Sequence, residues 1–188
     1  MGRLRHRFPV HPLQKRIFIC GEHERVDYRC SGISHFICIA NPGATVTLPE
    51  WFKGACLQLW FGDVVSERDA ALCNTRAVSE EDIRQAIEFS RAALQEPETK
   101  MLVSCNYGAS RSTGLAYVLL ADHLGAGKEA EAFQLMLKIR ETAVPNGMVI
   151  RVADAVLERN GELLGPLRKF NAELSSELFP VSYGFKRS

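Results

Sequence analysis

The amino-acid sequence predicts an α/β fold in three layers, with a mostly parallel central sheet of about four strands and helices on both faces. Short apolar runs predict strands at 16–20, 34–40, 55–61 and 101–104, and several helices follow the last of them. The first two runs are continuous rather than alternating, as expected for parallel strands that are buried on both faces.

Length and composition are those of one domain with extensions. The chain has 188 residues, 46% of them apolar, and a formal net charge of +1. We expect a basic arm at 1–15, a folded domain at 16–160, and an extension at 161–188 that packs on the domain and frays at its end. The arm is either a solvated leader or a docking arm for an acidic partner.

Charge and hydropathy exclude several classes of partner. A net charge of +1 predicts no strong attraction to nucleic acid or to a membrane surface. The longest apolar run, at 115–121, is too short to cross a bilayer, and no signal-peptide pattern stands at the N-terminus. We therefore expect a cytoplasmic protein, and the sequence leaves its oligomeric state open.

Turn residues separate the expected elements of the N-terminal half. Gly21 stops the first strand, and an Asn-Pro-Gly turn at 41–43 ends the second. A helical turn at 48–53 is broken by Gly54, and a polar loop to residue 78 follows the third strand.

The cysteines and histidines do not predict a metal site. None of the six cysteines forms a C-x-x-C pair. Cys20 and Cys38 fall inside apolar strands, and the spacing of these cysteines to His23, Cys30 and His35 matches no common zinc pattern. We expect reduced cysteines and no metal or other cofactor.

The helices of the C-terminal half have clear boundaries. Ser79 is an N-cap with Asp82 at the third helical position, which predicts a helix over 79–94. Further helices are expected at 112–124 and 128–140, in a segment that Pro145-Asn146 opens and that ends at 158, and in a short stretch around 163–170. Asn146 is expected to cap its helix, and Arg140 or Arg151 either frames a site or is solvated.

The segment 101–114 predicts an anion site. A buried strand leads into a loop of small and polar residues and then into a buried helix. Loop N–H groups and the positive end of the helix dipole then point at one spot. Cys105 at the strand end is a candidate nucleophile, because the same groups would stabilise its thiolate.

The side chains around Cys105 suit a phosphoryl group. Arg111 can hold two oxygens through its planar fork, and Ser112 can hydrogen-bond the Cys105 sulfur. Gly108 lets the loop backbone approach a ligand closely. The residues expected to contact the substrate are Asn106, Tyr107, Gly108, Ala109 and Ser110.

Cys105-x5-Arg111-Ser112, with Gly108 inside, resembles the signature loop of the cysteine-dependent protein tyrosine and dual-specificity phosphatases. The resemblance implies their small α/β fold, with 16–160 as a phosphatase-like catalytic domain, and hydrolysis through a phosphocysteine intermediate. This family usually has His before the Cys, where this chain has Ser104. The Pro145-Asn146 pair is similar to a bacterial branch of tyrosine phosphatase-like proteins.

Hydrolysis by this route also needs an acid that protonates the leaving oxygen. Asp63 stands just past a strand end, at the sheet edge where parallel α/β proteins bind ligands. Glu67 and Asp69 lie on the same loop and are alternatives. The family resemblance also favours Asp63, since its members carry a general acid on such a loop.

The sequence therefore predicts a phosphomonoester hydrolase, with a phosphoprotein as the expected partner. A catalytically weak or dead phosphate-binding module (a pseudophosphatase) is the main alternative, and Ser104 is the feature in its favour. An arsenate reductase would need a resolving cysteine close to Cys105 in sequence, and none is there. Phosphotyrosine, phosphoserine or phosphothreonine, and small phosphate esters all remain open as substrates.

Overall fold

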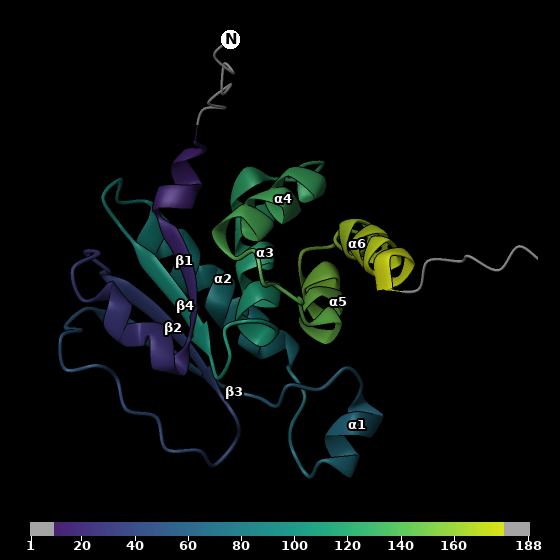
Figure 1. Ribbon diagram of the computed structural model, residues 1–188, viewed down its shortest axis with the longest axis horizontal. Coiled ribbons are helices and arrows are strands. Elements are labelled where there is room, and N and C mark those ends of the chain that lie inside the picture. Colours follow the sequence, from purple (N-terminus) through teal and green to yellow (C-terminus); the bar gives the residue numbers. More distant parts are fainter. Residues whose placement is uncertain (1–9, 179–188) are drawn as a thin grey trace, which may run out of the picture.

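The computed structural model describes residues 10–178, and a parallel sheet of four strands lies at its centre (Figure 1). The spatial order is β1 (Ile17–Gly21), β4 (Met101–Cys105), β2 (His35–Ala40) and β3 (Ala55–Trp60). All three pairings are parallel. The last strand in sequence, β4, thus lies between the first two. The loop that follows β4 therefore starts from an inner strand, at the carboxyl ends of the parallel strands.

Five α-helices form the larger covering layer. Helix α3 (Arg111–Leu124) packs against β4 and β1, with α2 (Glu80–Leu94), α4 (Glu129–Ile139) and α5 (Gly147–Val156) around it (Figure 1). Helix α6 (Leu164–Leu178) packs outside α4 and α5. Helix α3 is buried continuously from Arg111 to Ala121, which explains its lack of a polar face in the sequence.

A thinner layer covers the other face of the sheet. It consists of the 3-10 helix η2 (Glu22–Tyr28) and the irregular segment 41–54 (Figure 1). Its small core is made of Cys20, Phe36, Cys38, Phe52 and Leu102. The three-layer α/β prediction is confirmed, and the helix on this second face is a 3-10 helix rather than an α-helix.

Of two local predictions in the N-terminal half, one differs from the structure and one agrees with it. Helix α1 (Glu67–Leu72) lies within the stretch expected to be a polar loop, with Ser66 as its N-cap. Only Ala70 of this helix is buried, so the sequence shows no apolar stripe there. The expected helical turn at 48–53 is present, since the Phe52 N–H donates to the Pro49 carbonyl oxygen at 2.9 Å.

The two predicted extensions are only partly within the described residues. The 3-10 helix η1 (Pro12–Lys15) occupies the end of the expected arm and buries Leu13. Leu163 and Leu167 join the core at the start of the expected extension. Residues 1–9 and 179–188, including the end expected to fray, lie outside the described part, and the three-part division of the chain stays a prediction. Between residues 10 and 178, no helix has the length and hydropathy that crossing a membrane requires.

Candidate active site

The loop 106–110 joins the end of β4 to the N-terminus of α3 and is packed tightly against β1. Gly108 has a φ of +69°, and a Cβ atom there would lie 2.3 Å from the backbone nitrogen of Gly21. The N–H of Glu22 donates to the carbonyl oxygen of Asn106 at 2.9 Å. Only glycine combines this φ with this close approach, so Gly108 sets the path of the loop.

The carbonyl oxygens of the loop are used by neighbouring segments. The N–H of Val144 donates to the carbonyl of Ala109 at 2.8 Å, and that of Asn146 donates to the carbonyl of Ser110 at 3.1 Å. Within the described residues, the N–H groups of 106–110 donate to no protein acceptor. Free N–H groups that precede a helix N-terminus form an anion-binding cradle, as the sequence predicts.

Cys105 lies at the base of this loop. Its side chain is on the α-helical face of the sheet and is 2% exposed. The Cys105 Sγ and the Ser112 Oγ are 3.1 Å apart, within hydrogen-bonding distance. The structure therefore brings together the expected nucleophile and the hydroxyl expected to stabilise its sulfur.

Arg111 is buried beside the loop, and hydrogen bonds to the protein hold one end of its guanidinium in place. Its Nη1 donates to the Asn41 Oδ1 at 2.8 Å and to the Phe61 carbonyl oxygen at 2.9 Å. Its Nε is buried without a hydrogen-bond partner in the described part of the chain and lies 3.9 Å from the Asp63 Oδ2. A buried N–H donor of this kind calls for an acceptor, and an oxyanion in the loop supplies one.

Asp63 is held at the rim of the same loop. Its Oδ1 accepts hydrogen bonds from the Ser110 Oγ at 2.7 Å and from the Asn146 Nδ2 at 2.8 Å. The alternative acids lie in the first turn of α1, where the Asp69 Oδ2 accepts a hydrogen bond from the Ser66 Oγ at 2.8 Å. Of the three acids, Asp63 hydrogen-bonds the loop 106–110 directly, through Ser110.

Asn146 has two tasks, of which the sequence predicts one. As expected, its Oδ1 caps α5 by accepting from the N–H groups of Met148 and Val149. Its Nδ2 binds Asp63 as well as the Val64 carbonyl oxygen, at 3.1 Å. The sequence predicts the cap but gives no sign that Asn146 also binds Asp63, which lies 83 residues earlier in the chain.

Asn41 and Arg140 complete the surroundings of the loop. The sequence predicts only a turn at Asn41, and in the structure its side-chain oxygen also accepts a hydrogen bond from Arg111. Arg140 frames the loop, because it forms an ion pair with Glu24 at 3.0 Å while its Nη2 donates to the Tyr107 carbonyl oxygen at 3.4 Å. Arg151 is exposed on α5.

The cavity above the loop is small and open. It has a volume of about 280 Å³, and Asp63, Asn106, Tyr107 and Arg111 contribute to its wall together with Cys73. Tyr107 is 72% exposed, so its ring is free to contact a substrate. Cys73 lies on the segment expected to be a polar loop, and nothing in the sequence pointed to its position here.

The residues weighed for zinc do not form a cluster. Between residues 10 and 178, no three His, Cys, Asp or Glu side chains come together as a metal site would require. Cys20 and Cys38 are buried in neighbouring parts of the sheet, and burial raises the pKa of Cys20 to about 12, which keeps this thiol neutral.

Comparison with solved structures identifies the fold. Human DUSP28 superimposes with a TM-score of 0.59 at 19% identity, covering 79% of this chain and 94% of that one. A mouse putative dual specificity phosphatase complexed with zinc tungstate gives 0.59 at 19% identity, with 81% and 87% covered. The human tyrosine phosphatase-like serine/threonine/tyrosine-interacting protein gives 0.56 at 18% identity, with 89% and 96% covered.

Sequence comparison adds nothing to this result, since no protein-family model and no curated protein matches the chain. The similarity to a bacterial branch therefore stays a prediction. At identities below 20%, the superpositions show the architecture alone. This chain has the fold of the tyrosine and dual-specificity phosphatases.

Proposed function

We propose that the protein hydrolyses phosphate monoesters through a phosphocysteine intermediate, as a tyrosine or dual-specificity-type protein phosphatase. The observation that carries the proposal is the grouping of Cys105 and Ser112 beneath free loop N–H groups, with Arg111 and Asp63 in contact at the rim. This set contains a nucleophile, an oxyanion holder and an acid, which are the groups that the reaction needs.

In the first step, the Cys105 thiolate attacks phosphorus and the bond from phosphorus to the ester oxygen breaks. Arg111 and the N–H groups of 106–110 hold the three non-reacting oxygens while charge redistributes in the transition state. Asp63, protonated, gives its proton to the leaving oxygen. Since Ser110 and Asn146 both bind its Oδ1, the Oδ2 is the oxygen left for this transfer.

In the second step, water attacks the phosphocysteine. Asp63, now ionised, takes the proton of the attacking water, the sulfur–phosphorus bond breaks, and inorganic phosphate leaves. The Ser112 hydroxyl donates a hydrogen bond to the departing thiolate, to which its oxygen is already close at 3.1 Å. In these two steps Cys105 is the nucleophile, Arg111 holds the phosphoryl oxygens, and Asp63 gives and then takes the proton.

A phosphoprotein is the substrate that we favour, because the cavity over the loop is shallow and open enough for a side chain of a folded partner. The mechanism requires reduced Cys105, so a reducing compartment such as the cytoplasm suits it. The second candidate function is a pseudophosphatase that binds phosphate without turnover, which Ser104 before the nucleophile favours.

The first test is hydrolysis of an aryl phosphate by the wild-type protein and Cys105→Ser. We expect turnover by the wild type and none by Cys105→Ser, because a serine hydroxyl in this setting is a far weaker nucleophile than a thiolate. Steady-state release of the phenol measures both, and Cys30→Ser serves as the matched control, since Cys30 is exposed and does not line the cavity over the loop. Wild-type rates in Cys105→Ser would refute the mechanism, and a wild type that binds phosphate without turnover would favour the pseudophosphatase.

The second test distinguishes Asp63 from the other acids. We expect Asp63→Asn to slow hydrolysis of a poor leaving group, such as phenyl phosphate, by about 10²- to 10³-fold, since general acid catalysis contributes on that order. A p-nitrophenyl ester should be affected less, because its leaving group needs little protonation. Asp69→Asn and Glu67→Gln are the controls, and a larger loss in either of them would assign the acid to α1.

A further inference from the structure

Arg25 lies buried beneath the end of β4, on the face of the sheet opposite to the α-helices. It belongs to η2 and is 5% exposed. Its Nε donates to the Ser104 Oγ and its Nη2 to the Cys38 Sγ, each at 3.1 Å, and its guanidinium carbon lies 5.4 Å from the centre of the Phe36 ring. The sheet and the second layer thus enclose most of this cation.

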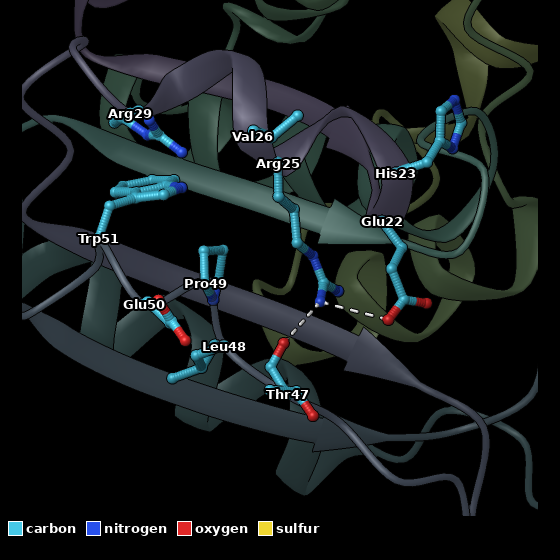
Figure 2. A pocket seen from close by; sticks show the side chains of 10 residues that line it. All are labelled: Glu22, His23, Arg25, Val26, Arg29, Thr47, Leu48, Pro49, Glu50 and Trp51. Atoms are coloured by element: carbon cyan, nitrogen blue, oxygen red, sulfur yellow. Dashed lines mark hydrogen bonds and ion pairs between the residues drawn. The ribbon is translucent and has the colours of Figure 1, made fainter.

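The positive charge of Arg25 has weak compensation. Its Nη1 lies 3.5 Å from the Glu22 Oε1 and 3.5 Å from the Thr47 carbonyl oxygen, both long contacts, and the Glu22 side chain is 53% exposed (Figure 2). The thiols beside it do not compensate, because burial raises the pKa of both Cys20 and Cys38. Burying a charge without a close counter-ion costs free energy. An anion that binds near Arg25 would lower this cost, so the site favours an anionic ligand.

Arg25 lines a cavity that reaches the loop 106–110, where such an anion can bind. Arg25, Asn106 and Arg111 all line one small cavity of about 140 Å³, with Asn41 in the same wall. A larger groove of about 730 Å³ runs along η2. Figure 2 shows that the Arg25 guanidinium lies in this groove on the side where the strands end. Arg25 therefore stands between this groove and the loop.

A hydrogen-bonded path connects Arg25 to the nucleophile. Ser104, which receives the hydrogen bond from Arg25, directly precedes Cys105, and its Oγ also lies 3.4 Å from the Cys105 carbonyl oxygen. Ser104 is fully buried and carries no charge of its own. The positive charge behind the loop on this face thus comes from Arg25.

We propose that Arg25 is a positioning residue of the phosphate site: it fixes the end of β4 through Ser104 and adds a buried positive charge that strengthens the binding of an oxyanion in the loop. The inference rests on the proposed function, because it takes the loop 106–110 as the place where phosphate binds. It assigns to η2, on the far side of the sheet from α3, a part in recognising the phosphoryl group.

The test is calorimetric binding of inorganic phosphate to the wild type and variants. Arg25→Met removes the charge and should weaken phosphate binding about tenfold, the order of effect expected of one positive charge that lines the same cavity in a protein of intermediate dielectric. Arg25→Lys keeps the charge and should stay within about threefold of the wild type. Arg29→Met is the matched control, since Arg29 is exposed in the same segment, and it should bind phosphate as the wild type does.

A second pair of variants remains informative if changes at Arg25 prevent folding. Glu22→Gln removes the exposed carboxylate that pairs with Arg25 and lines the same small cavity. It should tighten phosphate binding about twofold to threefold, because that carboxylate offsets the charge of Arg25. Asp27→Asn removes the same charge from an exposed position of the same helix and should change the affinity less. Unchanged affinity in Glu22→Gln would overturn the inference.

Other outcomes separate this inference from the proposed function. A folded Arg25→Met with wild-type phosphate affinity overturns the role of Arg25 and leaves the hydrolase proposal intact. Equal losses in Arg25→Lys and Arg25→Met overturn the contribution of charge and reduce Arg25 to a structural residue. A wild type that binds phosphate but hydrolyses no ester defeats the hydrolase proposal, while the order of affinities among the variants still supports or overturns Arg25.

Discussion

Gly108 is the residue that most constrains the shape of the loop 106–110. Its φ of +69° and the 2.3 Å that would separate a Cβ from the Gly21 nitrogen are independent obstacles to any side chain. A shift of the loop away from β1 would also break the 2.9 Å hydrogen bond between Glu22 and Asn106. The N–H groups would then no longer converge on one point.

We therefore expect Gly108→Ala to abolish phosphate binding and to lower hydrolysis by at least about 100-fold, the loss typical of a misplaced oxyanion donor. Calorimetry with phosphate and steady-state kinetics measure the two effects. Gly127→Ala is the matched control, because Gly127 has a φ of +81° but open space around it. That variant should lose about 1 kcal/mol of stability and keep its activity. Equal activity in both variants would contradict the steric argument.

The site residues differ in how far sequence could identify them. Cys105, Arg111 and Ser112 belong to one strand–loop–helix segment, so their spacing alone indicates a shared anion. The roles of Asn41 and Asn146 could not be predicted, because each depends on a contact between distant segments. Arg25 was missed for the same reason, since a single arginine in a polar stretch gives no sign of burial.

At the scale of elements, strands and capped helices follow closely from local sequence. All four strands and the helices from α2 onward were predicted, with differences mostly at their ends. The capping box of α2 is present as expected: the Ser79 side chain accepts from the Asp82 N–H, and the Asp82 carboxylate accepts from the Ser79 N–H. The sequence did not predict helix α1, because this helix buries only Ala70 and therefore has no apolar face with helical spacing.

Asp82 makes the stability of α2 depend on pH. Burial alone would raise its pKa, but hydrogen bonds from Arg76 and Ser79 outweigh burial and lower the pKa below its ordinary value. A lowered pKa means that the carboxylate stabilises the fold above the pKa of the unfolded chain, near 4, and that this stability is lost as pH falls through the folded value.

Asp82→Asn should therefore reduce the free energy of unfolding by about 1–2 kcal/mol at pH 7, the range of a strong N-terminal cap. The difference from the wild type should shrink as the pH falls below about 4 and vanish only below the lowered pKa of the folded state, where both states of the wild type bind the proton. Urea denaturation at several pH values measures it, with the exposed Glu88→Gln as the control. A difference that persists unchanged at acid pH would mean that the charge of Asp82 is not the cause.

At the scale of the whole molecule, the site and the packing of the outer helices are separable. Phe133 of α4 is 1% exposed and contacts Tyr117 of α3 and Phe170 of α6, with ring centres 5.0 and 5.6 Å apart. The Tyr117 hydroxyl donates to the Leu163 carbonyl oxygen at 3.0 Å, which further ties α6 to the buried helix. This cluster lies on the α-helical side of the molecule, and neither its ring contacts nor this hydrogen bond involves the loop 106–110.

Phe133→Ala should lower the free energy of unfolding by about 3–5 kcal/mol, because it leaves a cavity where three helices meet. At a temperature where the variant is folded, its affinity for phosphate should equal that of the wild type. Chemical denaturation and calorimetry measure the two quantities, and Gln134→Ala on the exposed side of α4 is the control. A loss of phosphate affinity in a folded Phe133→Ala would show that the outer helices and the loop are coupled.

The sequence by itself determined the layered α/β fold and the core of the site, since apolar runs, caps and the Cys105-x5-Arg111 spacing act within short segments. The tertiary structure alone decided that β4 lies between β1 and β2, which brings Asp63 and Asn146 to the loop on one side and Arg25 beneath it on the other. The physical reason is that strand order and the burial of a charge depend on which distant surfaces pack together. Local propensities contain no information about that choice.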